Sequence, residues 1–203
     1  MSVLTQVLSD LGLALQSEEV INNFILLFQK WNQSINLSAA RSQSEILEHI
    51  VDSLHVIPHL RATLDGNSAA AHVLDVGSGG GLPAAIVAIC APEIHVTALE
   101  PVHKKHAFLR TVARQLSLAN FEPLAERLDD HAHRDYDIAM SRATFDLQEW
   151  LLRGLSHVRT GGVVLGFEAV LRTDLPAGCR RYPYALNGKP RAIIALQRAA
   201  GHP

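Results

Sequence analysis

Between residues 73 and 168, short apolar runs alternate with longer stretches of helical character. We predict helices over 83–91, 103–118 and 147–158. The predicted strands around them are VLDV (73–76), HVTALE (95–100), FEPLA (121–125), DIAMS (137–141) and GGVVLGFE (161–168). Strands that alternate with helices form parallel sheets whose two faces are covered. This alternation predicts an α/β fold.

The segments on either side of this region differ from it. Apolar residues recur at helical spacing over 17–31, with Ser17 as the N-cap, and again over 44–60. Near the end, CRRYPYAL and RAIIALQR flank NGKP and predict an antiparallel hairpin. We therefore expect one compact unit with two parts. An N-terminal helical extension (1–65) leads through the loop RATLDGNSAAAH into a core (66–203) with a mostly parallel, seven-stranded sheet flanked by helices.

Composition excludes several classes of protein. The 203 residues are 48% hydrophobic and 19% charged, which suits one sizeable core. The apolar stretch at 84–91 is too short to span a bilayer, and the first residues lack the basic start of a secretory signal. Cys90 and Cys179 match no metal or disulfide spacing, and Cys90 is expected in the core. We expect a cytoplasmic monomer without a metal site or membrane partner.

The sequence LDVGSGGGLP (74–83) lies between the first predicted strand and a helix that we expect to begin at Pro83. In open α/β sheets, ligands bind beyond the carboxyl ends of the strands, where this loop lies. The loop has no lysine, which excludes a P-loop, and Leu82 replaces the third glycine of a dinucleotide fingerprint. Its acid and glycines resemble the first motif of S-adenosylmethionine-dependent methyltransferases: Asp75, Gly77, Gly79 and Gly81.

Glu100 ends the second predicted strand, 25 residues after Asp75. A carboxylate at this place accepts hydrogen bonds from both hydroxyls of a ribose. The loop and Glu100 together predict a nucleoside-containing cofactor. Glu100 alone does not separate S-adenosylmethionine from NAD.

Further segments resemble one bacterial family more specifically. They are KWNQSINLSAAR (30–41), HIVDSL (49–54), LEPVHKKHAFLR (99–110) and MSRA (140–143). With the glycine loop, they resemble the RsmG family, also called GidB, which methylates N7 of a guanine in the 530-loop region of 16S ribosomal RNA. The resemblance covers most of the chain. It implies a Rossmann-like class I methyltransferase fold, S-adenosylmethionine as cofactor, and 16S RNA or the 30S subunit as partner.

The resemblance also implies functional residues by position. Glu100 matches the family's ribose-binding acid, and the other implied cofactor contacts are Gly77, Leu82, Leu128, Asp129 and Arg142. Asp129 alternatively belongs to a plain acidic loop, and Arg142 to the surface. Arg127 and Arg142 are the candidates that position RNA or cofactor beside the transferred methyl group. His49 and Asp52, three residues apart, are interpreted as a structural pair that holds the extension onto the core.

Basic residues concentrate in two segments although the formal net charge is −2. Residues 103–114 carry four basic residues and no acid, and residues 172–198 carry six against one acid. The first sixty residues carry two against six. These segments predict either solvated surfaces or contacts with RNA phosphates. The candidate RNA-binding residues are Lys104, Lys105, Arg110, Arg114, Lys189 and Arg191.

The implied reaction needs little from side chains. Guanine N7 already carries an in-plane lone pair, so we expect no catalytic base, and the sequence shows no His–carboxylate or Cys–His constellation that would supply one. We expect catalysis by positioning. Glu168 departs from the family, which usually has a lysine there. Either the RNA contacts have moved, onto residues such as Lys189 and Arg191, or the substrate differs. The alternatives are a methyltransferase of another RNA or a small molecule, and a non-catalytic RNA-binding assembly protein.

Overall fold

The computed structural model describes residues 1–40, 42–64 and 71–199. The expected boundary between extension and core, at residues 65 and 66, lies outside the described residues, as does half of the predicted loop RATLDGNSAAAH. Among the described residues, no helix has the length and apolar character that crossing a membrane requires.

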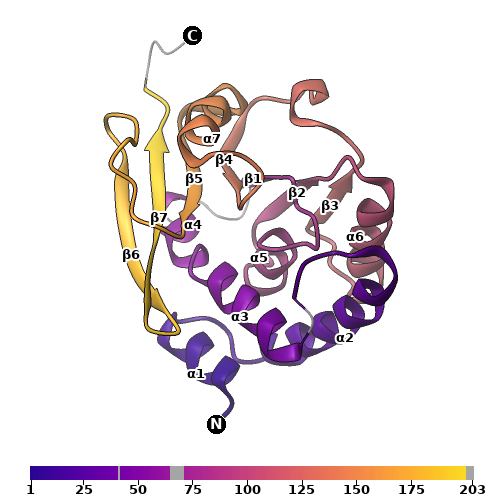
Figure 1. Ribbon diagram of the computed structural model, residues 1–203. Helices are drawn as coiled ribbons and strands as arrows, with labels where there is room; N and C mark the ends of the chain where they lie inside the picture. The colour runs from indigo at the N-terminus through magenta and orange to yellow at the C-terminus, as the bar shows by residue number, and fades with distance from the viewer. Residues whose placement is uncertain (41, 65–70, 200–203) are drawn as a thin grey trace.

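Seven strands form a single sheet, in the order β3-β2-β1-β4-β5-β7-β6 (Figure 1). The first five pair in parallel, whereas β7 runs antiparallel to β5 and β6 antiparallel to β7. The mostly parallel sheet and the terminal hairpin are thus confirmed. The strands are β1 (His72–Val76), β2 (His95–Leu99), β3 (Phe121–Leu124), β4 (Tyr136–Ser141), β5 (Val158–Glu168), β6 (Arg180–Leu186) and β7 (Lys189–Gln197).

Helices cover both faces of the sheet. One hydrophobic cluster joins alternate strand residues such as Ile138 and Met140 to six helices. The intervening residues, such as Ala139, face a second cluster with α7 (Leu147–Gly154). The six helices are α1 (Val3–Asp10), α2 (Ser17–Ile35), α3 (Gln43–Leu54), α4 (Ile57–Leu64), α5 (Ala84–Cys90) and α6 (His103–Gln115).

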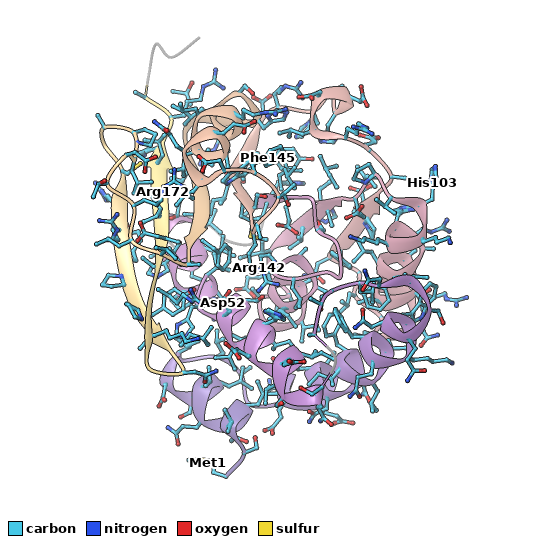
Figure 2. The ribbon with its side chains drawn as sticks, viewed as in Figure 1. Met1, Asp52, His103, Arg142, Phe145 and Arg172 are labelled. Carbon is cyan, nitrogen blue, oxygen red and sulfur yellow. The ribbon has the colours of Figure 1, made fainter. Side chains whose placement is uncertain are left out.

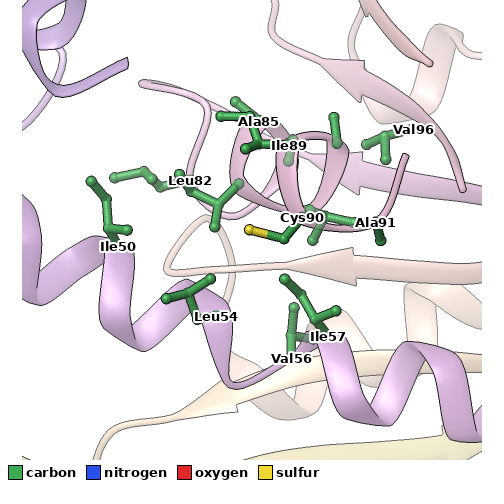
Figure 3. Close-up of a cluster of buried hydrophobic side chains, with 14 of the residues drawn as sticks. Ile50, Leu54, Val56, Ile57, Leu82, Ala85, Ile89, Cys90, Ala91 and Val96 are labelled. Atoms are coloured by element: carbon green, nitrogen blue, oxygen red, sulfur yellow. The ribbon is translucent and has the colours of Figure 1, made fainter. Parts of the chain in front are cut away.

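The N-terminal helices share the core of the sheet. Side chains of α3 and of the following turn, among them Ile50 and Leu54, face Leu82 and the helix α5 (Figure 3). Cys90 lies in this cluster as predicted, and burial raises the pKa of its thiol to about 11. The extension therefore helps to set the position of the glycine loop, because the loop runs into α5.

Three predicted elements have different limits. The stretch 44–60 is two helices, because Pro58 has no N–H to donate to the carbonyl of Leu54. The strand β5 begins at Val158, before the glycines that seemed to mark its start, and the predicted helix 147–158 ends earlier, with α7 followed by a 3₁₀ turn at Leu155–His157. The register between β5 and β4 shifts between Tyr136 and Ile138 of β4. Gly161 and Gly162 therefore lie beside an irregularity within the sheet.

Smaller differences concern where helices begin. Gln16, and not Ser17, is the N-cap of α2, and Pro83 is the N-cap of α5 rather than its first residue. Both differences are a single position, which is the ordinary uncertainty of a helix end.

Candidate active site

The glycine loop lies where the strand order of the sheet reverses. β2 and β3 lie on one side of β1, and β4 and β5 on the other, so the loops after β1 and β4 flank a crevice at their carboxyl ends. The N–H of Gly77, which has a φ of +72°, donates to the carbonyl of Leu99 at 2.9 Å. The loop thereby remains tied to the end of β2.

The glycines of the loop leave room for other side chains of the protein at some positions and for open space at another. A Cβ on Gly77 would lie 2.2 Å from Oγ1 of Thr144, and one on Gly80 would lie 2.5 Å from the ring of Phe28. These glycines admit other parts of the protein. A Cβ on Gly79 would meet only the Gly77 carbonyl oxygen, at 3.7 Å, so Gly79 borders open space.

This open space is a cavity of about 380 Å³, which we call the loop cavity. Six of the residues predicted from the sequence line it: Gly77, Gly79, Leu82, Glu100, Lys105 and Arg142. Two other predicted cofactor residues do not. Asp75 is buried beneath the loop, and Gly81 packs toward Ala85 and Leu109.

Glu100 is held with its carboxylate at the edge of the loop cavity. Its Oε2 accepts a hydrogen bond from the N–H of Gly79 and its Oε1 accepts one from the N–H of Val102, each at 2.8 Å. Only 4% of the residue is exposed. Each carboxylate oxygen has a further lone pair, so Glu100 retains capacity to accept from two ligand hydroxyls.

The carboxylate of Asp75 is fully buried, and neither oxygen has a hydrogen-bond partner among the described residues. Burial raises the pKa of Asp75 to about 7; the nearby Ser78 hydroxyl, which itself donates to the main-chain carbonyl of Asp75, and the positive charge of Arg142 oppose that rise. A buried negative charge without a partner is unfavourable for the protein alone. It favours a positively charged ligand above the loop.

The N-terminal extension supplies one wall of the loop cavity, which the sequence analysis did not predict. Phe28, Leu37 and Ser38 line it. The buried Asn32 holds this segment, because its amide donates to the carbonyl of Ala40 at 2.7 Å and accepts from the N–H of Ser38 at 3.0 Å. The segment KWNQSINLSAAR was the available signal, although nothing in it indicated a contact with the glycine loop.

A second cavity, of about 550 Å³, adjoins the first, and we call it the junction cavity. It lies between α3, the residues after β4, and the terminal hairpin. Phe145, Phe167 and Tyr184 give it aromatic walls. Three residues line both cavities: Ser38, Arg142 and Ala143. A ligand in one cavity is therefore next to a ligand in the other.

Arg142 lies at the boundary of the two cavities, next to Asp52 of α3 (Figure 2). Its Nη1 donates to Oδ2 of Asp52 at 3.3 Å and to the carbonyl of His49 at 3.4 Å. Oδ1 of Asp52 accepts from the hydroxyl of Tyr184 at 2.6 Å. A contact between extension and core is present at both residues: Asp52 makes it through its carboxylate, with Arg142 and Tyr184, and His49 through its main-chain carbonyl, with Arg142.

Three further predicted residues lie away from both cavities. Leu128 is buried in the second core, whereas Asp129 is exposed and forms an ion pair with Arg153. Arg127 is exposed beside them, at the start of the short 3₁₀ helix Leu128–Asp130. Neither cavity is lined by any of the three.

A contact between a histidine and a carboxylate lies outside both cavities. Nδ1 of His131 lies 2.7 Å from Oε2 of Glu126, and Nε2 lies 2.9 Å from the hydroxyl of Tyr136. None of these three residues lines the loop cavity or the junction cavity. The pair therefore has the position of a structural contact.

Glu168 lines the junction cavity, but its charge is compensated. Its two oxygens accept from Nε and Nη2 of Arg181, each at 2.9 Å, and Oε1 also accepts from the N–H of Arg172 at 2.9 Å. Only 4% of the Glu168 side chain is exposed. The sequence suggested that Glu168 reverses the local charge. Arg181 of β6 compensates this negative charge at the end of β5.

The candidate RNA-binding residues occupy two separated surfaces. Exposed basic side chains lie on α6 and on the tip of the hairpin, and no carboxylate pairs with them among the described residues: Lys104, Arg110, Arg114 and Lys189. Lys105 is half-buried at the loop cavity. Arg191 is half-buried at the junction cavity, where its Nη1 donates to the carbonyl of Ala169.

Comparisons with known proteins agree on one family. The family model GidB, described as rRNA small subunit methyltransferase G, matches residues 17–174. Ribosomal RNA small subunit methyltransferase G of Bordetella avium is 37% identical over 169 residues, which cover 81% of this chain and 75% of that protein. The protein of that name from Aromatoleum aromaticum is 36% identical over 214 residues, covering 97% and 98%.

Solved structures agree on the fold. Magnesium protoporphyrin IX methyltransferase from Synechocystis, with S-adenosylmethionine bound, has a TM-score of 0.62 at 14% identity, covering 87% of this chain and 97% of that one. A mutant of MtNAS in complex with S-adenosylmethionine has a TM-score of 0.56 at 16% identity, covering 91% and 77%. The predicted class I methyltransferase fold is confirmed.

Proposed function

Because the chain belongs to the GidB family, described as rRNA small subunit methyltransferase G, we propose that it methylates N7 of a guanine in the 530-loop region of 16S ribosomal RNA. Its cofactor is S-adenosylmethionine, and methylation of small-subunit rRNA is its activity. The choice of N7 and of the 530 loop is the proposed part. With such a substrate, we place the enzyme in the cytoplasm and expect it to act as a monomer.

The residues of the loop cavity fit the cofactor. The carboxylate of Glu100 suits the ribose hydroxyls, and the unsubstituted backbone at Gly79 admits a nucleoside. The unpartnered charge of Asp75 beneath the loop suits a ligand with a positive ammonium and sulfonium. When bound, S-adenosylmethionine supplies a methyl group on a positively charged sulfur.

The junction cavity suits the acceptor base. An enzyme that acts on a base in folded RNA takes it out of its stack and holds it between aromatic or apolar side chains. Phe145, Phe167 and Tyr184 provide such walls beside the boundary at Arg142. The unpaired basic residues of α6 and the hairpin would bind phosphates on both sides, which supports an RNA acceptor over a small molecule.

The chain's contribution to the reaction is orientation. N7 of guanine has a free lone pair in the plane of the ring, so no side chain has to remove a proton before attack. Ser38, Arg142 and Ala143 line both cavities, and they would hold the acceptor against the cofactor and keep water from between them. Such alignment alone lowers a two-substrate barrier by several kcal/mol.

The observation that carries this proposal is that the two cavities meet at Arg142. It is tested by transfer of labelled methyl from S-adenosylmethionine to 30S subunits, free 16S RNA and a pool of small metabolites, followed by nucleoside analysis. We expect the label in 7-methylguanosine within the 530 loop. Arg142→Ala should abolish most transfer, whereas Arg159→Ala, at an exposed ion pair away from both cavities, should keep it.

Other results would separate the alternatives. Label in a different nucleoside or only in small metabolites would contradict the proposed acceptor. Binding of S-adenosylmethionine and RNA without any transfer would instead favour an assembly protein.

A further inference from the structure

Asp52 joins three parts of the chain through one carboxylate. It lies on α3, in the N-terminal extension. Its Oδ1 accepts a hydrogen bond from the hydroxyl of Tyr184, on strand β6. Its Oδ2 accepts a hydrogen bond from Nη1 of Arg142, in the loop after β4. Only 15% of the Asp52 side chain and 18% of the Arg142 side chain are exposed. The contact is therefore shielded from water, where an ion pair is stronger than on a surface.

Asp52 and Arg142 differ in what they can reach. Asp52 lines the junction cavity only, whereas Arg142 lines both cavities. Among the described residues, Nη1 is the only guanidinium nitrogen of Arg142 with a partner, and Nε and Nη2 retain their N–H donors. Asp52 thus fixes one edge of a planar group and leaves the remaining donors for an oxygen atom at the boundary.

We propose that Asp52 is a positioning residue for methyl transfer, which holds the Arg142 guanidinium in the orientation that aligns acceptor and cofactor. This inference rests on the proposed function. Asp52 does not line the loop cavity, and we expect it to act through Arg142. The helical extension thereby contributes to the alignment of the reactants, since it supplies the anion that orients Arg142, in the loop after β4.

Tyr184 completes the arrangement on the far side of Asp52. Burial is the main cause that raises the pKa of its phenol, so the hydroxyl stays protonated and donates to Asp52. The ring of Tyr184 also stacks on His55, with centroids 4.1 Å apart. Loss of the hydroxyl should loosen Asp52 without removing its charge, and Tyr184→Phe should have a smaller effect than changes at Asp52.

A double-mutant cycle tests whether Asp52 acts through Arg142. Asp52→Asn keeps the size of the side chain and can still accept from Tyr184. We expect it to lower the single-turnover rate of methyl transfer to the RNA on the order of 30-fold, because small misplacements of reacting groups cost such factors. S-Adenosylmethionine affinity should stay within about threefold, as expected for a residue that acts in the transition state.

Asp52→Asn should not lower the rate of methyl transfer any further in a protein that already lacks the Arg142 side chain. The double variant Asp52→Asn/Arg142→Ala should therefore transfer methyl at the rate of Arg142→Ala alone, within about twofold, as non-additive neighbours do. An equal loss in both backgrounds would overturn the proposal, because Asp52 would then act independently of Arg142. Asp174→Asn removes an ion-paired carboxylate outside both cavities and serves as the matched control.

A second measurement needs no activity. In ¹⁵N spectra of arginine side chains, the Nε–H signal of Arg142 is identified by its absence in Arg142→Ala. We expect Asp52→Asn to shift or broaden this signal, Tyr184→Phe to do so more weakly, and Asp174→Asn to leave it unchanged. An unchanged Arg142 signal in Asp52→Asn would overturn the proposal. Failure of the wild-type protein to methylate RNA would contradict the proposed function, whereas this spectrum would still decide whether Asp52 positions Arg142.

Discussion

At the scale of single residues, Asp75 links the stability of the fold to the binding of its ligand. Its pKa is raised by burial from 3.8 to about 7. Between these pH values the folded protein binds more protons at this site than the unfolded chain, so the site makes the free energy of unfolding fall as pH rises. The buried charge is most costly above pH 7, where a positive ligand would compensate it.

The first prediction concerns Asp75→Asn. We expect this variant to be more stable than the wild type without cofactor, with a larger difference at pH 8 than at pH 5, because only the wild type acquires the buried charge. Its affinity for S-adenosylmethionine should decrease. Urea unfolding at both pH values and calorimetric titration measure the two effects. A difference in stability that is the same at pH 5 and pH 8 would contradict the raised pKa.

The second prediction concerns Glu168, whose charge Arg181 compensates. Glu168→Lys should lower the free energy of unfolding by about 3 kcal/mol, because it breaks a pair with one buried partner and faces two cations toward each other. S-Adenosylmethionine affinity should not change, since Glu168 does not line the loop cavity. Chemical unfolding and titration test this, with Glu168→Gln as the uncharged control. A loss of cofactor binding by folded protein would show that the two cavities are not separate at this point.

At the scale of elements, local patterns predicted the sheet and the place of the loop. The alternation of apolar runs and the glycines of 77–81 are local features that can be recognised within a short stretch of sequence. Glu100 could be recognised in the same way, because it directly follows the next strand. The break at Pro58 was also readable from the sequence and was missed, because the apolar periodicity continues through it. The predicted strand begins at Gly161, whereas β5 starts at Val158, because a glycine pair can stand at an irregularity inside a strand as well as at its end.

The contribution of the N-terminal extension to the wall of the loop cavity could not be predicted from local sequence patterns. Phe28 fills the space that a side chain on Gly80 would occupy, although the two residues are far apart in the sequence. Such a contact depends on how a helix docks on the finished sheet. Likewise, the spacing of His49 and Asp52 suggested a pair, but the partners of Asp52 come from residues 142 and 184.

The third prediction concerns α2 and the segment after it. Asn32→Ala should release residues 36–40 from the rim of the loop cavity, because it removes both hydrogen bonds that hold them. We expect a loss of about 2 kcal/mol in the free energy of unfolding, the usual cost of unsatisfied buried groups. Affinity for S-adenosylmethionine should also fall. Gln33→Ala, at an exposed neighbour on the same helix, is the control and should change neither quantity.

The fourth prediction concerns the contact of the N-terminal helices with the terminal hairpin. His55 and His59 stack on Tyr184 and Tyr182, and burial lowers the pKa of both imidazoles below 6.5. The unfolded chain therefore takes up these protons first, so the stability from these sites is present above pH 6.5 and is lost as pH falls below it.

Unfolding is measured at pH 7.5 and pH 5.5. Between these pH values Asp75 changes the stability in the opposite direction, so the contribution of the two histidines is measured as a difference between proteins that both keep Asp75. The double variant His55→Phe/His59→Phe keeps aromatic stacking but cannot take up protons, and the wild type should lose stability relative to it over the same interval. An equal change in both proteins would mean that other groups cause the acid sensitivity; His49 and His157, whose pKa values are also lowered by burial, are retained in the variant.

At the scale of the whole molecule, the basic residues of α6 and of the hairpin tip other than Lys105 and Arg191 lie outside the two cavities. The basic side chains of α6 and of the hairpin tip point to solvent, whereas the boundary of the cavities contains Arg142 and Asp52 as a pair. Under the proposed function, phosphate binding and alignment of the base would therefore depend on different residues.

The fifth prediction follows from this separation. The triple variant Lys104→Ala/Arg110→Ala/Arg114→Ala should bind RNA more weakly, and the slope of log affinity against log salt should decrease by roughly 2 as phosphate contacts are lost. S-Adenosylmethionine affinity should be unchanged. Filter binding over a series of salt concentrations measures the slope. An unaltered slope would assign RNA contact to another surface and leave α6 as a solvated helix.

The two cavities also draw on different lengths of the chain. The lining of the loop cavity ends at Thr144, whereas the junction cavity needs Tyr184 and Arg191 from the terminal hairpin. A ribosome that translates this message has emitted every residue of the first cavity well before the last wall of the second exists. Synthesis therefore imposes an order in time: the growing chain contains every residue that lines the proposed cofactor cavity before it contains the last walls of the proposed base cavity.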